Sequence, residues 1–128
     1  MKTEIKALWT DALRSGVYTQ TQNHLRDAKG FCCLGVLCDI AKDQIGAQWG
    51  EMHPTGCDFI YGDGIEAGCL PPVVQEWAGL SDRNPGVNIG TTGSGSGPHA
   101  VESRASLANL NDSGMSFREI ADIIEKSL

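Results

Sequence analysis

The sequence contains no long hydrophobic run. No segment approaches the roughly 18 apolar residues that a membrane-spanning helix needs. The first 16 residues, MKTEIKALWTDALRSG, also lack the apolar core of a secretory signal. Both absences predict a cytosolic protein with no membrane partner.

Basic residues are few. Ten Lys and Arg stand against 16 Asp and Glu, which gives a formal net charge of -6. A chain with this balance repels the phosphate backbone on average, whereas duplex binding depends on clustered Lys and Arg. We therefore expect no duplex nucleic-acid partner.

Aromatic residues are also scarce, at 6% of the chain, while glycine is abundant, with 16 residues among 128. This composition is typical of an aliphatic core connected by many turns. The length is close to that of one average domain and suffices for a core without disulfides or metal. We expect a single domain over residues 1–128.

The cysteines do not form a recognisable framework. Five is an odd number, three of them fall between Cys32 and Cys38, and no CxxC pair occurs. Reduced thiols are therefore expected. His53 with Cys57 and the more distant Cys69 form only a loose set of zinc-type ligands, because structural zinc sites show closely spaced pairs. We expect no metal site and no cofactor.

The centre of the predicted fold is GFCCLGVLCDIA, residues 30–41. From Cys32 to Lys42 the chain is apolar nearly all round, which is typical of a central helix. A buried strand is the competing interpretation, but the segment continues through Asp39 without a break. Because glycine costs about 1 kcal/mol relative to alanine inside a helix, Gly35 indicates a close backbone contact.

Helical spacing and end signals predict four further helices. One begins with Thr3 as N-cap and ends at Gly16, a short one is opened by Pro71 and Pro72 and ended by Gly79, one covers 102–110, and the last follows the capping box of Ser116 and Glu119. Short apolar pieces at 48–52 and 58–61 predict hairpin strands. The expected fold is α+β: about five helices around the Cys-rich helix, a small antiparallel sheet and long loops.

Residues 81–99 contain TTGSGSGP and are predicted to be a flexible loop or a lid. The Gly90–Gly97 segment lacks the Lys-Ser/Thr ending of a P-loop. As a lid, it would close over a bound ligand.

One polar stretch combines an aromatic ring, two guanidinium groups and several amides. Arginine pairs with phosphate or carboxylate, tyrosine can stack on a base, and amides can contact a base edge. A small anionic ligand with a flat ring would suit this mixture, and a solvated loop is the alternative interpretation. The candidate binding residues are Arg14, Tyr18, Gln20, Gln22, His24 and Arg26.

A catalytic interpretation is also open. Cys32 or Cys33 would lie at the start of the central helix, where the helix dipole and unpaired N–H groups lower a thiol pKa. A cysteine hydrolase would then need His53 or His99 as its base. The alternative is that both thiols are small core residues.

Four segments together resemble a family of small proteins encoded in phage and prophage genomes: RSGVYTQTQNHLR, GFCCLGVLCDIA, LPPVVQEWAGL and LANLNDSGMSFREIADIIE. The resemblance implies a phage-encoded accessory protein of the host cytosol. One recurrent task of such proteins is counter-defence by sequestering nucleotide alarm signals, usually as small homo-oligomers. The leading expectation is a non-catalytic sponge for a phosphate-bearing ligand such as a cyclic nucleotide or an ADP-ribose-type signal. The alternatives are the cysteine hydrolase and a protein-binding inhibitor of a host factor.

Overall fold

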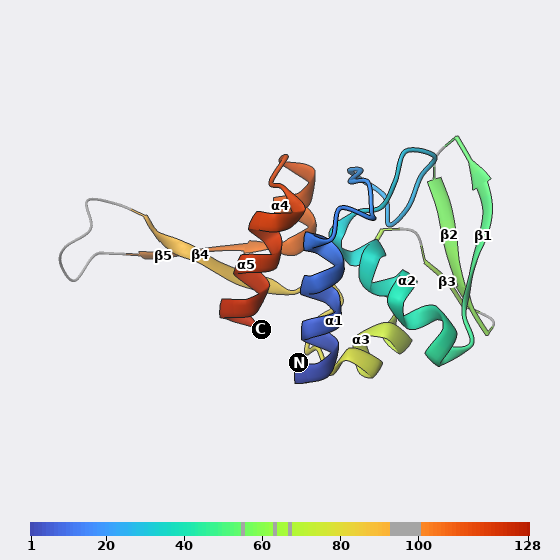
Figure 1. The fold of residues 1–128 in the computed structure, drawn as a ribbon, viewed down its shortest axis with the longest axis horizontal. Coiled ribbons are helices and arrows are strands. Elements are labelled where there is room, and N and C mark those ends of the chain that lie inside the picture. The colour runs from blue at the N-terminus through green and yellow to red at the C-terminus, as the bar shows by residue number, and fades with distance from the viewer. Residues whose placement is uncertain (55, 63, 67, 93–100) are drawn as a thin grey trace.

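The computed structural model describes residues 1–54, 56–62, 64–66, 68–92 and 101–128. Within them the fold is α+β, as predicted. The helices are α1 (Thr3–Arg14), α2 (Cys33–Ile45), α3 (Pro72–Ala78), α4 (Leu107–Asp112) and α5 (Phe117–Ser127). The strands are β1 (Gln48–His53), β2 (Gly56–Tyr61), β3 (Gly64–Glu66), β4 (Gly86–Thr92) and β5 (Val101–Ser106), and Figure 1 shows their arrangement.

Helix α2 is the central element, as predicted. It packs against α1, α3 and α4, and its residues from Cys33 to Cys38 are all buried. Cys32 is the N-cap, and its Sγ accepts a hydrogen bond from the N–H of Gly35 at 3.3 Å. Gly46 ends the helix with φ +68°, a left-handed conformation that glycine adopts without strain.

Helices α1 and α5 lie side by side, and each buries one apolar face. The N-cap of α5 is Ser116, whose Oγ accepts from the N–H of Glu119 at 3.2 Å, as predicted. The predicted cap of α1 is wrong. Thr3 is already helical, and the N-cap is Lys2, which makes no side-chain capping bond. The backbone N–H of Lys2 instead donates to the carbonyl of Ala78, so a tertiary contact fixes this helix start.

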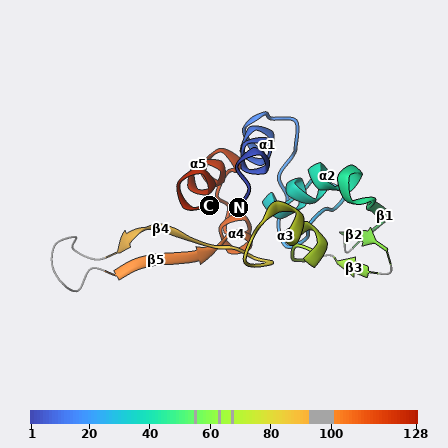
Figure 2. The same ribbon diagram turned by 90° about the horizontal axis from the view of Figure 1, so that it is seen from below.

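Strands β1, β2 and β3 form an antiparallel sheet in that order, beside α2 in both views (Figures 1 and 2). The two predicted strands are β1 and β2. Phe59 of β2 is fully buried and pairs in register with Trp49 of β1. Helix α3 also follows its prediction, with Pro72 in the first turn and Gly79 ending it at φ +72°.

Strands β4 and β5 form a separate two-stranded ribbon that extends away from the helices in both views (Figures 1 and 2). The helix predicted over 102–110 is therefore wrong in its first half, where Val101–Ser106 pairs with β4. The helix begins at Leu107, capped by Ser106, whose Oγ accepts from the N–H of Asn109. Helical spacing in this short window could not reveal a strand partner from another part of the chain.

The predicted irregular segment 81–99 is also shorter than expected, because Gly86–Thr92 is strand β4. Residues 93–100, which include most of the glycine-rich segment and His99, lie outside the described residues. Across the described part of the chain, every helix is too short or too polar to cross a lipid bilayer.

Candidate functional site

Residues 15–32, the pocket loop, connect α1 to α2 and lie directly against the start of α2. A Cβ atom at Gly35 would overlap the carbonyl oxygen of Leu25, and one at Gly30 would overlap that of Thr19. The N–H of Cys32 donates to the Leu25 carbonyl at 3.0 Å, and that of Phe31 donates to the Thr19 carbonyl at 2.8 Å. The close contact predicted for Gly35 is therefore the one that seats this loop on the central helix.

A single buried amide holds the pocket loop from the other side. Asn111, the penultimate residue of α4, is fully buried. Its Oδ1 accepts from Gln20 Nε2 at 2.9 Å and from the N–H of Cys33 at 3.1 Å, and its Nδ2 donates to the carbonyl of Thr21 at 2.7 Å. One side chain thus joins α4, the pocket loop and the first turn of α2.

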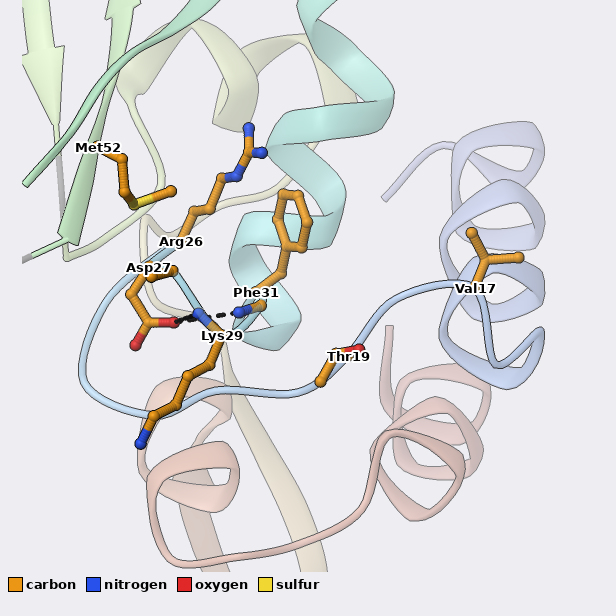
Figure 3. A pocket seen from close by; sticks show the side chains of 9 residues that line it. Val17, Thr19, Arg26, Asp27, Lys29, Phe31 and Met52 are labelled. Atoms are coloured by element: carbon orange, nitrogen blue, oxygen red, sulfur yellow. Dashed lines mark hydrogen bonds between the residues drawn. The ribbon is translucent and has the colours of Figure 1, made fainter.

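The pocket loop lines an open surface cavity of about 260 Å³. Its lining comes almost entirely from that loop, and one residue comes from strand β1 (Figure 3). The lining residues are Val17, Thr19, Arg26, Asp27, Ala28, Lys29, Gly30, Phe31 and Met52. Arg26 and Phe31 point the same way, whereas Lys29 points away from them (Figure 3).

Arg26 is held by aromatic rings rather than by a carboxylate. Its guanidinium carbon lies 4.9 Å from the ring centre of Phe31 and 5.5 Å from that of Trp49. None of the carboxylates whose side chains the structure describes forms an ion pair with it. The rings orient a planar cation while leaving its N–H groups available for an acceptor.

Asp27 contributes the negative charge in the cavity wall, and local donors already bind it. Burial by itself would raise the pKa of this carboxyl group. Hydrogen bonds from the Thr21 hydroxyl and from the N–H groups of Lys29 and Gly30 outweigh that effect and lower the pKa. Asp27 is therefore ionised at neutral pH and shapes the turn at 27–30.

Behind the cavity, Asp39 of α2 connects two aromatic residues. Its carboxylate accepts from the Tyr18 hydroxyl at 2.6 Å and from Trp49 Nε1 at 3.0 Å. Burial, followed by the hydrogen bond to Asp39 and then the charge of Asp39, raises the pKa of Tyr18, so that side chain stays neutral. The Tyr18 and Trp49 rings each pack edge-on against Phe31, at centroid distances of 5.0 and 5.7 Å. This network fixes the aromatic surface on which Arg26 rests.

The structure does not gather the six predicted binding residues around one cavity. Only Arg26 lines it. Tyr18 supports Phe31 from behind, and the Gln20 amide is used by Asn111 and by the carbonyl of Met115. Gln22 is exposed, and the half-buried His24 lies beside Gly56 of β2.

Arg14 is bound by the C-terminal helix. Its guanidinium donates to Asp122 Oδ1 at 2.7 Å and to Glu125 Oε1 at 2.6 Å, both on α5. Periodicity assigned Arg14 to the end of a helix but could not show that the C-terminal helix lies alongside it. In the structure it connects α1 to α5 and does not line the cavity.

The two candidate nucleophiles are not accessible. Cys32 is 4% exposed and Cys33 is fully buried. Desolvation outweighs the nearby backbone N–H groups, raising the pKa of Cys32 to about 11 and that of Cys33 well above its ordinary value. These thiols are protonated at neutral pH and serve as core groups. This geometry gives no support to the cysteine hydrolase.

The loose set of possible zinc ligands does not converge. Cys57 is buried, with its Sγ 3.1 Å from the carbonyl oxygen of Gly50, while His53 is exposed at the end of β1. Among the described residues, no group of three or more His, Cys, Asp or Glu is arranged to hold a metal ion.

Comparison with known proteins places the whole chain in one family. A family model described as a domain of unknown function, DUF8296, matches residues 1–128. The chain belongs to this family. No curated protein and no solved structure matches it.

Sequence reasoning missed most of the cavity wall of this DUF8296 domain. Phe31 belongs to the predicted Cys-rich segment 30–41, Lys29 is not among the candidate binding residues, and Met52 comes from a strand far along the chain. One feature of the sequence could have indicated the site: the turn at 27–30, where Asp27 and Gly30 let the chain fold back and place Phe31 opposite Arg26. Met52 had no local sign, because only the position of β1 brings it to the loop.

Proposed function

We propose that this protein binds a small phosphate-bearing nucleotide in the Arg26 cavity and leaves it chemically unchanged. The observation that carries the proposal is the position of Arg26. Its guanidinium lies over Phe31 and Trp49 and lines a cavity, and it has no carboxylate partner among the side chains that the structure describes. Such a group forms charge-assisted hydrogen bonds with a phosphate, and a guanidinium plane can also stack on a flat ring.

The local charge supports an anionic ligand. Two cations, Arg26 and Lys29, and one anion, Asp27, line the cavity, in a protein whose formal net charge is -6. Lys29 is exposed and its side chain is flexible, so it contributes positive charge without a fixed direction. The planar guanidinium of Arg26 would instead orient the phosphate. Because the rest of the protein repels anions, recognition would rest on contacts at short range.

The cavity size limits what enters it. A volume of about 260 Å³ is slightly below the range of about 300 to 1,000 Å³ common for ligand pockets. One nucleotide unit would fit. A cyclic dinucleotide would place one unit inside and leave the other at the rim.

Sequestration is the biological role that we propose. The chain resembles proteins of phage and prophage genomes, and a non-catalytic binder in the host cytosol would lower the free concentration of a nucleotide alarm signal. Protonated, buried thiols at Cys32 and Cys33 favour capture over turnover. No cofactor is required for this role.

Calorimetric titration with a panel of cyclic dinucleotides, cyclic ADP-ribose isomers and simple nucleotides tests the proposal. We expect at least one member to bind and to be recovered unchanged, by chromatography and mass spectrometry, after heat release. Arg26→Ala should weaken that binding at least about tenfold, because a charge-assisted hydrogen bond contributes about 1.5 to 3 kcal/mol.

Two arginines provide matched controls. Arg118→Ala removes an exposed guanidinium from α5, and Arg14→Ala removes the one that joins α1 to α5. Both should leave ligand affinity unchanged. No binding across the panel, or equal losses from all three substitutions, would refute the proposal.

A second candidate, binding to a host protein, is favoured by the rim of the same cavity. Val17 is 80% exposed and Met52 is 43% exposed, and both line the cavity, so a partner protein would meet two apolar side chains there. Protein capture that is lost in Val17→Ser with Met52→Ser but retained in Arg26→Ala would select this candidate over nucleotide binding.

A further inference from the structure

The ribbon formed by β4 and β5 contacts the helices near its base, where β4 meets α5, β5 meets α4 and Val87 is fully buried. Its register runs from Gly86 opposite Ser106 at the base to Thr92 opposite Val101. In both views its outer part has no helix beside it (Figures 1 and 2). Within the described residues, each of the two strands pairs only with the other. Both outer edges are thus open, and a two-stranded ribbon alone is at best marginally stable in water.

The two edges differ in regularity. The register shifts between Asn88 and Gly90, so β4 contains an extra residue, Ile89, at that point. Such a bulge, together with a glycine, makes an edge a poor template for another strand. Strand β5 continues from Val101 to Ser106 with no extra residue. The regular edge is the one suited to accept a partner strand.

The sequence of β5 is complementary to itself. It reads Val-Glu-Ser-Arg-Ala from residue 101 to residue 105. When two such strands pair antiparallel about a two-fold axis at Ser103, Glu102 of each chain falls at the register position opposite Arg104 of the other. Val101 falls opposite Ala105. Opposite charges at facing positions favour a cross-strand pair, and shifting the register by two residues would lose both matches.

We propose that β5 pairs with β5 of a second copy of this chain, forming a four-stranded sheet in the order β4–β5–β5–β4. An isologous contact of this kind closes on itself as a dimer, since the same edge is used by both partners. The two helical bodies then lie at opposite ends of the sheet. This contact is separate from the Arg26 cavity, so it does not depend on ligand binding.

Five paired residues on each side make a small interface, well below the area of a stable dimer, so the association is weak. Sedimentation velocity from about 10 μM to about 1 mM covers the range in which such a contact assembles. We expect the wild-type chain to shift from monomer to dimer across this range.

Charge exchange tests the register directly. Glu102→Arg places Arg opposite Arg, and Arg104→Glu places Glu opposite Glu, so each should weaken dimerisation at least about tenfold. The double exchange restores both pairs and should recover the wild-type constant. An equimolar mixture of the two single variants should also dimerise. In the register within one chain, Glu102 lies opposite Thr91 and Arg104 opposite Asn88, so neither exchanged position has an oppositely charged residue directly across from it.

Exchanges on exposed helix positions control for net charge. Asp11→Arg changes the charge as Glu102→Arg does, and Arg118→Glu matches Arg104→Glu. Both should leave the dimer unchanged. A wild-type chain that stays monomeric up to about 1 mM overturns the proposal. So does a dimer that is insensitive to the single exchanges or is not restored by the double one.

Discussion

The α-carbon of Gly35 in helix α2 lies against the carbonyl group of Leu25 in the pocket loop. A side chain at position 35 would overlap that carbonyl group, although alanine is intrinsically the better helix former. The contact joins two backbones, so neither neighbour can move aside by changing a rotamer. The loop that carries Arg26 is therefore seated on the core at a point where only glycine fits.

Gly35→Ala should destabilise the protein by about 1 to 3 kcal/mol, the usual cost of overpacking a core, even though the substitution favours helix formation locally. Urea unfolding followed by circular dichroism measures this change. Gly68→Ala is the control, since a Cβ there meets no atom within 4 Å and should change stability little. Unchanged or increased stability in Gly35→Ala would contradict the close contact.

Asn111→Asp should destabilise the fold by about 2 to 4 kcal/mol, because the new carboxylate would face the Thr21 carbonyl where an N–H now donates. The same change at Asn109, exposed on the same helix, should have little effect. Thermal unfolding of the two variants provides the comparison. Equal melting temperatures would show that the buried amide does not hold the pocket loop.

Stability should fall in acid. Partial burial would raise the pKa of Asp39, but hydrogen bonds from Tyr18 and Trp49 and the charge of Lys42 outweigh it and lower that pKa. A carboxyl group with a lowered folded-state pKa stabilises the fold above its unfolded pKa of about 3.9, and this contribution is lost as the pH falls through the folded value. We therefore expect the free energy of unfolding to decline below about pH 4.

Asp39→Asn should lower stability at pH 7 by about 2 kcal/mol, in line with hydrogen bonds to a charged acceptor. It should also reduce the decline in acid, because an amide does not titrate. Urea titrations at neutral and acid pH measure both effects. Asp43→Asn, at an exposed position of the same helix, should leave the neutral stability and the acid decline as they are in the wild type.

Cys32 and Cys33 should react slowly with iodoacetamide in the folded protein at neutral pH, because both thiols are buried and burial raises their pKa. Cys69 is part-exposed and should be labelled first. Timed labelling followed by peptide mass spectrometry gives the order. Rapid modification of Cys32 or Cys33 in the folded protein would make the cysteine hydrolase a candidate function again.

The sequence by itself determined those helices whose formation and ends depend on residues close by in the chain. Apolar residues on nearly every side made α2 a central helix, Ser116 and Glu119 marked the start of α5, and Pro72 and Gly79 bounded α3. These features depend on neighbours within one or two turns, so a short window of sequence contains their physical cause.

Tertiary structure alone decided what depends on partners distant in the chain. Residues 101–106 form a strand because they pair with β4. Arg14 binds α5 because two carboxylates of that helix lie within ion-pair distance. The cavity formed where the pocket loop, held by Gly35 and Asn111, places Arg26 on Phe31 beside a strand from the middle of the chain. Each of these contacts stabilises residues whose local sequence permits more than one conformation.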